Sequence, residues 1–221
     1  MICWSCEKDA GAGALCAACG APQPVSTHGA QPDHFAVLGV PRRYDVEAGA
    51  LEARYKELSR QLHPDRFAKA DPRARRASLQ RTVQLNEAWR ALKEPEKRAE
   101  YLLALGGVKI ATDDGGARSG GVAASPALLM EILELREALG DARAAHDDAE
   151  VARMGEAMRA RAGEAAARVA AGLTAPAGEL TTARLEGVAR ELVALRYFRR
   201  FLDEVAAHAD ARDSNDEARH G

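Results

Sequence analysis

The chain has 221 residues, a formal net charge of −2 and a composition that is 47% hydrophobic but only 5% aromatic. Abundant alanine, leucine, arginine and glutamate, without alternating β-branched runs, predict an almost all-α protein. The near-neutral charge gives no global case for nucleic-acid binding, and no apolar run approaches the roughly 20 residues of a membrane-spanning helix. Because the first residues lack the basic and apolar stretches of a secretion signal, we expect a cytoplasmic protein with reduced thiols.

Composition divides the chain into six segments. All four cysteines fall in the first segment, proline and glycine mark two linkers, and the two longest segments have helical patterns. The last segment is too polar to fold by itself. We therefore predict a metal-binding element, a linker, a helical domain, a flexible linker, a helical bundle and a disordered tail, with the bounds 1–21, 22–32, 33–107, 108–124, 125–209 and 210–221.

The cysteines form two CxxC pairs with nine residues between the pairs. Four soft thiolates at this spacing suit a tetrahedral zinc ion, and four protein ligands make such a site structural. Gly20 directly follows the second pair and permits a tight turn. An element this short folds only because metal binding supplies free energy. Iron suits the same ligands, and unpaired thiols or a disulfide remain alternatives. The predicted zinc ligands are Cys3, Cys6, Cys16 and Cys19.

The first helical block predicts two antiparallel helices joined by a loop. Pro64 removes a backbone donor and pushes His63 out of the helical region, so the first helix ends there and His63-Pro64-Asp65 forms the loop. Residues 60–81 contain seven basic and two acidic residues, a local net charge of +5. Gly106-Gly107 is a helix-stop signal. The apolar stripes of the two helices are Leu51, Tyr55, Leu58 and Leu62, and Leu85, Ala88, Trp89 and Leu92.

The stretches DHFAVLGV, YKELSRQLHPD and NEAWRALKEPEKRAEY resemble a J-domain, the module through which DnaJ-type co-chaperones engage DnaK-type chaperones. The resemblance implies that a basic helix docks on an acidic face of the chaperone. It also implies that Asp65 contacts a chaperone arginine and helps to trigger ATP hydrolysis, with His63 and Pro64 shaping the loop. The basic residues expected to steer docking are Arg54, Lys56, Arg60 and Arg66.

The loop also has plainer interpretations. It is a helix-ending turn beside a solvated basic face if the resemblance is fortuitous. A catalytic His–Asp pair is a further alternative, but no nucleophile or second acid lies nearby in the sequence. We therefore interpret the tripeptide as a docking element of a protein that is not an enzyme.

Residues 125–142 predict one helix with two apolar surfaces. Ser125 is placed to cap this helix and Pro126 to open it. Leu128, Ile132, Leu135 and Leu139 form a narrow stripe expected in the core. A second apolar set lies on the far side, which we interpret as a partner site; the alternative is that a third helix covers it. This second set and its acidic border are Leu129, Met130, Leu133, Glu134 and Glu137.

The stretches LLMEILELREAL and LRYFRRFLDEV resemble the C-terminal domain of the co-chaperone HscB. In that family a helical bundle recruits the IscU-type iron–sulfur scaffold and delivers it to an HscA-type chaperone. The resemblance implies a three-helix bundle whose scaffold-binding surface combines the second apolar set with Tyr197, for which Phe198 is an acceptable substitute. Some members carry an N-terminal four-cysteine element. Arg66 stands where lysine is commoner after the tripeptide, a change that keeps the charge.

These resemblances together predict an adaptor between a DnaK/HscA-type chaperone and an IscU-type scaffold. One alternative is a general DnaJ-like co-chaperone with a zinc module, which would present a broad apolar groove to unfolded polypeptides. Another is a zinc-dependent nucleic-acid binder, which the scarcity of Lys and Arg near the cysteines disfavours.

Overall fold

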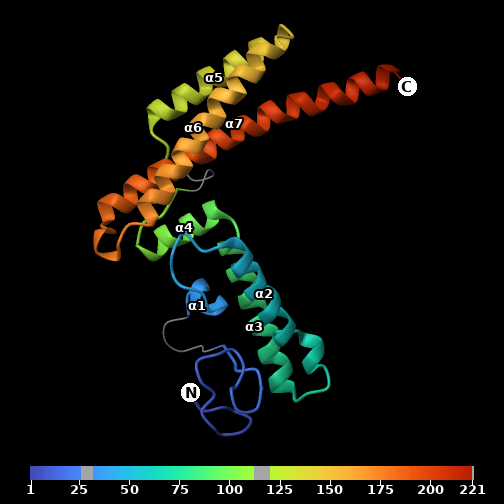
Figure 1. Ribbon diagram of the computed structural model, residues 1–221, viewed down its shortest axis with the longest axis vertical. Coiled ribbons are helices and arrows are strands. Elements are labelled where there is room, and N and C mark those ends of the chain that lie inside the picture. Colours follow the sequence, from blue (N-terminus) through green and yellow to red (C-terminus); the bar gives the residue numbers. More distant parts are fainter. Residues whose placement is uncertain (26–31, 112–119, 221) are drawn as a thin grey trace. The chain divides into compact units, whose positions relative to one another are not determined.

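The computed structural model describes residues 1–25, 32–111 and 120–220, without side-chain positions for Ala177 and residues 208–220 (Figure 1). The chain divides into two compact units, Met1–Tyr101 and Leu102–Gly221. The described residues form seven α-helices, two short 3-10 helices and isolated β-bridges, without an extended strand. The all-α prediction is therefore confirmed. Parts of the two predicted linkers, residues 26–31 and 112–119, lie outside the described residues.

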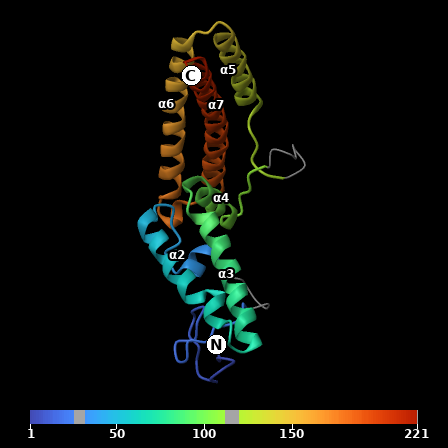
Figure 2. The same ribbon diagram turned by 90° about the vertical axis from the view of Figure 1, so that its right-hand side faces the viewer.

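The first unit is built around a helical hairpin. Helices α2 (Ala48–Leu62) and α3 (Pro72–Leu92) lie side by side in both views, joined by a 3-10 turn, η1 (Pro64–Phe67) (Figures 1 and 2). A short helix, α1 (His34–Leu38), packs against them, and α4 (Pro95–Leu105) follows α3. The hairpin that the two apolar stripes predict is confirmed.

The core of the hairpin follows those stripes. Leu51, Leu58 and Leu62 of α2 are buried, as are Leu85, Ala88 and Leu92 of α3. Tyr55 stacks on Trp89 with ring centroids 4.7 Å apart, and its hydroxyl donates to the side chain of Asn86. Arg98 is buried at the start of α4, where it donates to the carbonyls of Leu92, Tyr44 and Val46. The buried guanidinium thus supplies hydrogen bonds to carbonyl groups in the loop before α2 and at the end of α3, and it holds these two segments together.

The second unit contains three long helices: α5 (Pro126–Ala144), α6 (Asp148–Leu173) and α7 (Thr182–His220), with the 3-10 turn η3 (Ala177–Glu179) before α7. Helices α6 and α7 pack along each other in both views (Figures 1 and 2). Gly172 permits this close approach, because a Cβ atom there would lie 2.2 Å from Val188. The buried residues include Ile132 and Leu139 of α5 and Phe201 of α7. The predicted three-helix bundle is confirmed.

Helix boundaries in both units obey the local sequence signals. Ser125 caps α5 by accepting a hydrogen bond from the Leu128 amide, and Pro126 occupies the first turn. Helix α4 ends before Gly106-Gly107, where Gly107 takes a left-handed conformation with φ 82°. Helix α7 continues as far as His220, through the residues for which the sequence predicts a disordered tail.

Candidate functional sites

The four cysteines lie in two similar turns of a small N-terminal element, residues 1–25, here called the knuckle. In each turn the amide two residues after the first cysteine donates to its sulfur: Ser5 to Cys3 and Ala18 to Cys16, each at 3.4 Å. Gly20 follows the second turn with φ 72°, and Glu7 takes the same left-handed conformation after the first, with φ 57°. The tight turn expected at Gly20 is therefore present twice.

The four sulfur atoms have the spacing of a tetrahedral metal site. Sγ of Cys3 lies 3.7 Å from that of Cys19, Sγ of Cys6 lies 3.8 Å from that of Cys16, and all four atoms lie within 4.8 Å of one another. Metal–sulfur bonds of about 2.3 Å in a tetrahedron place sulfur atoms about 3.8 Å apart. The cysteines thus fit one metal ion held by four thiolates.

The thiols affect one another in a way that favours a bound cation. Burial alone would raise the pKa of Cys3, but backbone N–H groups of Cys6 and Ser5 and the neighbouring thiols lower it to about 6. The Lys8 amide lowers the pKa of Cys6, yet burial and the other three cysteines raise it to about 12. Four thiolates this close therefore need a cation to remain charged together.

The knuckle continues beyond its last cysteine into residues that the sequence assigns to a linker. Pro22 pairs with Leu15 as Asp9 pairs with Ile2, and the Gln23 amide donates to the Ala14 carbonyl. Prolines in a sequence favour a linker. Here, however, the carbonyls of Pro22 and Pro24 accept hydrogen bonds from the side chains of Trp4 and Arg81. Residues 22–24 therefore fold together with the cysteines as part of the knuckle.

The knuckle packs on helix α3 through two arginines that sequence reasoning assigned only to a general basic face. The Arg73 guanidinium lies 5.2 Å from the centre of the Trp4 ring. Arg81 donates to the carbonyls of Gln23 at 2.8 Å and Pro24 at 3.1 Å. In the sequence, Trp4 between Cys3 and Cys6 is the residue that could indicate such a contact. A large aromatic side chain has no part in binding a metal, so its presence suggests packing against another element.

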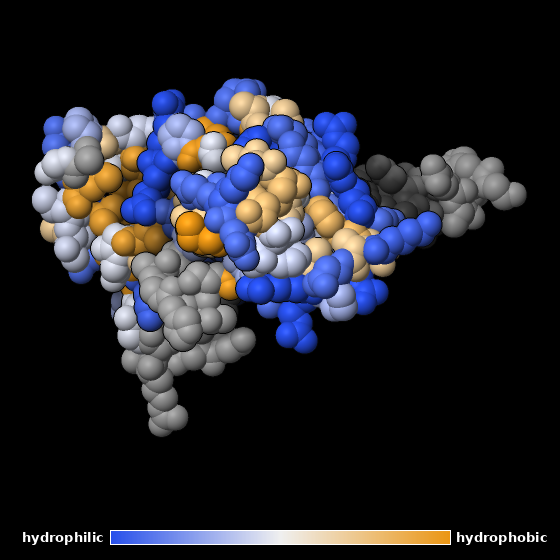
Figure 3. Space-filling model, turned by 90° about the horizontal axis from the view of Figure 1, so that it is seen from below, coloured by the Kyte–Doolittle hydropathy of each residue, from blue (hydrophilic) through white to orange (hydrophobic). Residues whose placement is uncertain are grey.

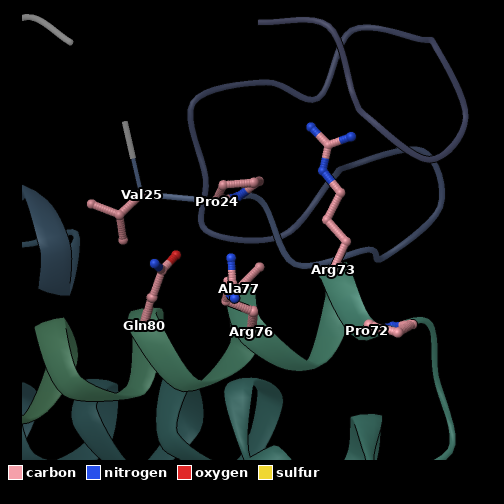
Figure 4. Close-up of a pocket in the computed structure, with 7 residues that line it drawn as sticks. All are labelled: Pro24, Val25, Pro72, Arg73, Arg76, Ala77 and Gln80. Atoms are coloured by element: carbon pink, nitrogen blue, oxygen red, sulfur yellow. The ribbon is translucent and has the colours of Figure 1, made fainter. Parts of the chain in front are cut away.

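A groove of about 620 Å³ lies between the knuckle and α3 (Figure 4). Pro24 and Val25 line it from the knuckle, while Arg73 reaches from α3 toward the knuckle. Figure 3 views the molecule from below Figure 1 and shows orange hydrophobic patches between blue hydrophilic side chains. Met1 and Ile2 are the exposed large hydrophobic residues of the knuckle.

The HPD loop (His63-Pro64-Asp65) stands at the tip of the hairpin. Pro64 opens η1, and His63 has an extended backbone with φ −55° and ψ 129°, as its position before proline predicts. Nδ1 of His63 accepts a hydrogen bond from the Asp65 amide at 3.3 Å. The Asp65 side chain is 90% exposed, and its Oδ2 lies 3.5 Å from Nδ1 of His63. The loop thus presents one exposed carboxylate on a capped turn.

Two hydroxyl groups of α3 hold the base of this loop. The Leu62 carbonyl is the last of α2, and its helical partner would be the Arg66 amide, which instead donates to the His63 carbonyl. Ser78 donates to it at 2.7 Å and Thr82 at 3.1 Å. Sequence reasoning missed both residues, because a hydroxyl on a helix gives no sign of its partner on another helix.

The four predicted steering residues have different environments. Arg54 donates to the Leu38 carbonyl at 3.1 Å and to Glu57 at 2.6 Å, so its charge is already engaged within the first unit. Lys56 pairs with Glu52 at 2.6 Å on the exposed face of α2. Arg60 and Arg66 are exposed, and neither forms an ion pair with any described residue. The available positive charge is therefore greatest beside the HPD loop.

The second apolar set of α5 is exposed in the bundle. Leu129, Met130 and Leu133 have 44%, 57% and 50% of their surface exposed, whereas Ile132 and Leu139 are buried and Leu128 and Leu135 half-buried. Glu134 and Glu137 are exposed at its border and form no ion pair with a described residue. We call these five residues, Leu129, Met130, Leu133, Glu134 and Glu137, the α5 patch.

The two aromatic candidates on α7 differ in access. Phe198 is buried and lies under the Arg161 guanidinium at 4.6 Å. Tyr197 is half-buried, with the Arg200 guanidinium 5.7 Å from its ring centre. Phe198 is therefore a core residue, whereas Tyr197 is partly exposed and accessible to a partner.

Comparisons with known proteins match both helical blocks. Residues 33–101 match the DnaJ domain, and residues 124–206 match the HSCB C-terminal oligomerisation domain. A co-chaperone protein HscB homolog from Bordetella petrii is 41% identical over 119 residues, 54% of this chain and 65% of that protein. A homolog of the same description from Aromatoleum aromaticum is 42% identical over 134 residues, 61% of this chain and 72% of that protein.

Solved structures give the same result. Chaperone HscB from Vibrio cholerae superposes with a TM-score of 0.64 at 28% identity, covering 81% of this chain and 99% of its own. Human co-chaperone protein HscB superposes with a TM-score of 0.72 at 24% identity, covering 94% and 98%, and this likeness concerns the fold. A J-domain followed by this bundle defines a J-domain co-chaperone. The chain belongs to the HscB co-chaperone family.

The chain spans just under two thirds of the Bordetella petrii relative and nearly three quarters of the Aromatoleum aromaticum relative. Among the described residues, no helix is long and apolar enough to cross a membrane.

Proposed function

We propose that this co-chaperone stimulates ATP hydrolysis by a DnaK/HscA-type chaperone and delivers to it an IscU-type scaffold for the maturation of iron–sulfur proteins. The observation that carries this proposal is the pairing, in one chain, of an exposed Asp65 beside free arginines with an exposed apolar patch bordered by glutamates. The first suits a charged partner and the second an apolar one.

The J-domain end acts by positioning a charge. Arg60 and Arg66 attract an acidic chaperone surface over distances of about one Debye length, roughly 8 Å at physiological salt. Asp65 then meets a chaperone arginine. This docking loses little conformational entropy, because the His63 cap and the hydrogen bonds to the Leu62 carbonyl already fix the loop. The chaperone carries out the hydrolysis, and this chain supplies no group to the reacting phosphate.

The bundle end holds the client. The three apolar side chains of the α5 patch provide a small desolvated centre, and Glu134 and Glu137 provide a charged edge that selects among partners. Tyr197 extends the surface onto α7. Because both sites belong to one chain, binding the scaffold raises its effective concentration at the chaperone.

The knuckle has a structural part in this function. We propose zinc as its metal, held by Cys3, Cys6, Cys16 and Cys19, because four thiolates close the coordination shell and leave no position for a substrate. The bound ion would supply the folding free energy that so small an element lacks.

The test is a single-turnover ATPase assay with an HscA-type chaperone, run with this protein alone, with an IscU-type scaffold alone, and with both. We expect stimulation by this protein and a further, more than additive increase when the scaffold is present. A denatured polypeptide serves as the control client. If it enhances hydrolysis as well as the scaffold does, the protein is a general J-domain co-chaperone and the iron–sulfur proposal is wrong.

A further inference from the structure

We propose that Gln23 is an outer-sphere residue of the metal centre, and that Arg81 links occupancy of this centre to docking of the knuckle on the J-domain. The inference rests on the proposed metal site and is independent of the proposed chaperone and scaffold. It concerns one unit of the chain, Met1–Tyr101, in which both elements lie.

The side chain of Gln23 reaches the metal ligands directly. It is 1% exposed, and its amide nitrogen donates to Sγ of Cys3 at 3.3 Å and to the Ala21 carbonyl at 2.8 Å. A buried amide with these two acceptors is fixed in orientation. Its hydrogen bond delocalises the charge of the Cys3 thiolate, the part that outer-sphere donors play at metal sites.

The backbone at Gln23 forms the other half of the connection. Arg81 donates through Nε to the Gln23 carbonyl and through Nη2 to the Pro24 carbonyl, and its remaining nitrogen donates to Gln84 at 3.1 Å. A guanidinium donates to two carbonyls at once only when both lie along one edge of its plane, where the N–H groups point. In a knuckle of 25 residues, the metal is what holds that backbone in place.

A second contact makes the connection two-sided. Trp4 lies between Cys3 and Cys6, and its indole nitrogen donates to the Pro22 carbonyl at 2.8 Å. The same ring lies against Arg73 of α3. Trp4 in the first cysteine turn and the carbonyls of Gln23 and Pro24 after the second therefore meet one helix, and the groove of Figure 4 exists only while the knuckle is docked.

The first test is hydrogen exchange of the full-length protein, loaded with Zn²⁺ or stripped by a chelator. Two charge-assisted hydrogen bonds of Arg81 are lost on stripping, so we expect amides between Ser78 and Leu85 to exchange about tenfold faster. Amides of α6 and α7 are the internal reference. Exchange that changes only within residues 1–25 would overturn the proposal.

Arg81→Ala tests the route of the connection. In the Zn²⁺-loaded variant, the same α3 amides should exchange as fast as in the stripped wild type, and chelation should add no further increase. Arg75→Ala is the matched control, because Arg75 is an exposed arginine on the same helix. A chelation effect on the amides between Ser78 and Leu85 that is as large in Arg81→Ala as in the wild type would show that Arg81 does not link the two elements.

Gln23→Leu tests the outer-sphere role with Co²⁺ as a spectroscopic probe. Loss of the hydrogen bond to Cys3 raises the energy of the thiolate electrons, so the sulfur-to-cobalt charge-transfer band should move to longer wavelength. Metal affinity should fall about 10- to 100-fold. Gln61→Leu, on α2 where the Gln61 side-chain amide donates to Glu57, should change neither property. An unchanged spectrum in a folded Gln23→Leu protein would overturn this role.

Discussion

The HPD loop and the α5 patch are both exposed, but they are prepared for binding in opposite ways. The loop displays one carboxylate, and hydrogen bonds from α3 and from its own histidine fix its backbone. The patch displays three flexible apolar side chains on a regular helix, with its stability supplied from the other side by Ile132 and Leu139. At the loop, hydrogen bonds fix the backbone itself. At the patch, the backbone is an ordinary helix that is stabilised by residues on its buried side.

This difference predicts how each site responds to change. Binding at the loop depends on charge and on a single group, so it should be lost sharply and should weaken with salt. Binding at the patch depends on apolar area shared among several side chains, so it should weaken in steps and tolerate salt. Substitutions at both sites test this contrast.

Asp65→Ala should have the largest effect. No other carboxylate stands on the loop, so affinity for the chaperone should fall about a hundredfold or more, as when one partner of a desolvated ion pair is removed. Stimulated hydrolysis should return to the basal rate in a single-turnover assay. Because Asp65 is 90% exposed and its carboxylate contacts the exposed His63 two residues away, the thermal midpoint should not move measurably. Retained stimulation would contradict the J-domain role of this residue.

The Leu129→Ala/Leu133→Ala double variant should have the next largest effect. Loss of two central apolar side chains should weaken scaffold binding by about 2–3 kcal/mol, roughly a hundredfold, as measured by calorimetric titration. Stimulation of the chaperone without scaffold should be unchanged.

Ile132→Ala is the control for this pair, because it lies on the same helix but is buried. It should lower the free energy of unfolding of the bundle by about 2–4 kcal/mol. The double variant should lower it by less than about 1 kcal/mol. If both proteins lose stability equally, Leu129 and Leu133 belong to the core and the α5 patch is not a binding surface.

Ser78→Ala should have an intermediate effect at the base of the HPD loop. It removes the shorter of the two hydrogen bonds to the Leu62 carbonyl, which should cost about 1–2 kcal/mol of J-domain stability in urea unfolding. Stimulation should fall by less than in Asp65→Ala, because the carboxylate remains. Thr82→Val removes the longer bond and should cost less; unchanged stability in both variants would show that the hydroxyls do not hold the loop.

The sequence predicts the local features of both sites but not the contacts between elements that support them. Helical periodicity alone separates Ile132 from Leu133 on α5, because burial on a regular helix repeats with its turn. The hairpin and the position of Asp65 follow from Pro64 and the flanking stripes. Contacts between elements are different: Ser78 to Leu62, or Arg81 to Gln23, depend on how two pieces pack, and no local pattern encodes them. The prolines around Gln23 favour a linker, and they give no sign that the Gln23 backbone bonds to Ala14 and Arg81.

Arg54 and Arg60 show the same limit within a single helical face. The sequence gives both a steering role, yet Arg54 is bonded to Leu38 and Glu57 whereas Arg60 has no ion pair among the described residues. Arg60→Ala should therefore reduce affinity for the chaperone about two- to fivefold, as surface charges do. Arg54→Ala should chiefly lower the stability of the hairpin.

Measuring both variants at two salt concentrations separates the roles. Raising salt should erase the difference between wild type and Arg60→Ala, because the Arg60 contribution is screened. The unfolding midpoint of Arg54→Ala should stay below that of wild type at either salt concentration, because its bond to the Leu38 carbonyl does not require a second charge. A salt-sensitive binding defect in Arg54→Ala, without loss of stability, would return that residue to the docking surface and shift the steering charge toward α1.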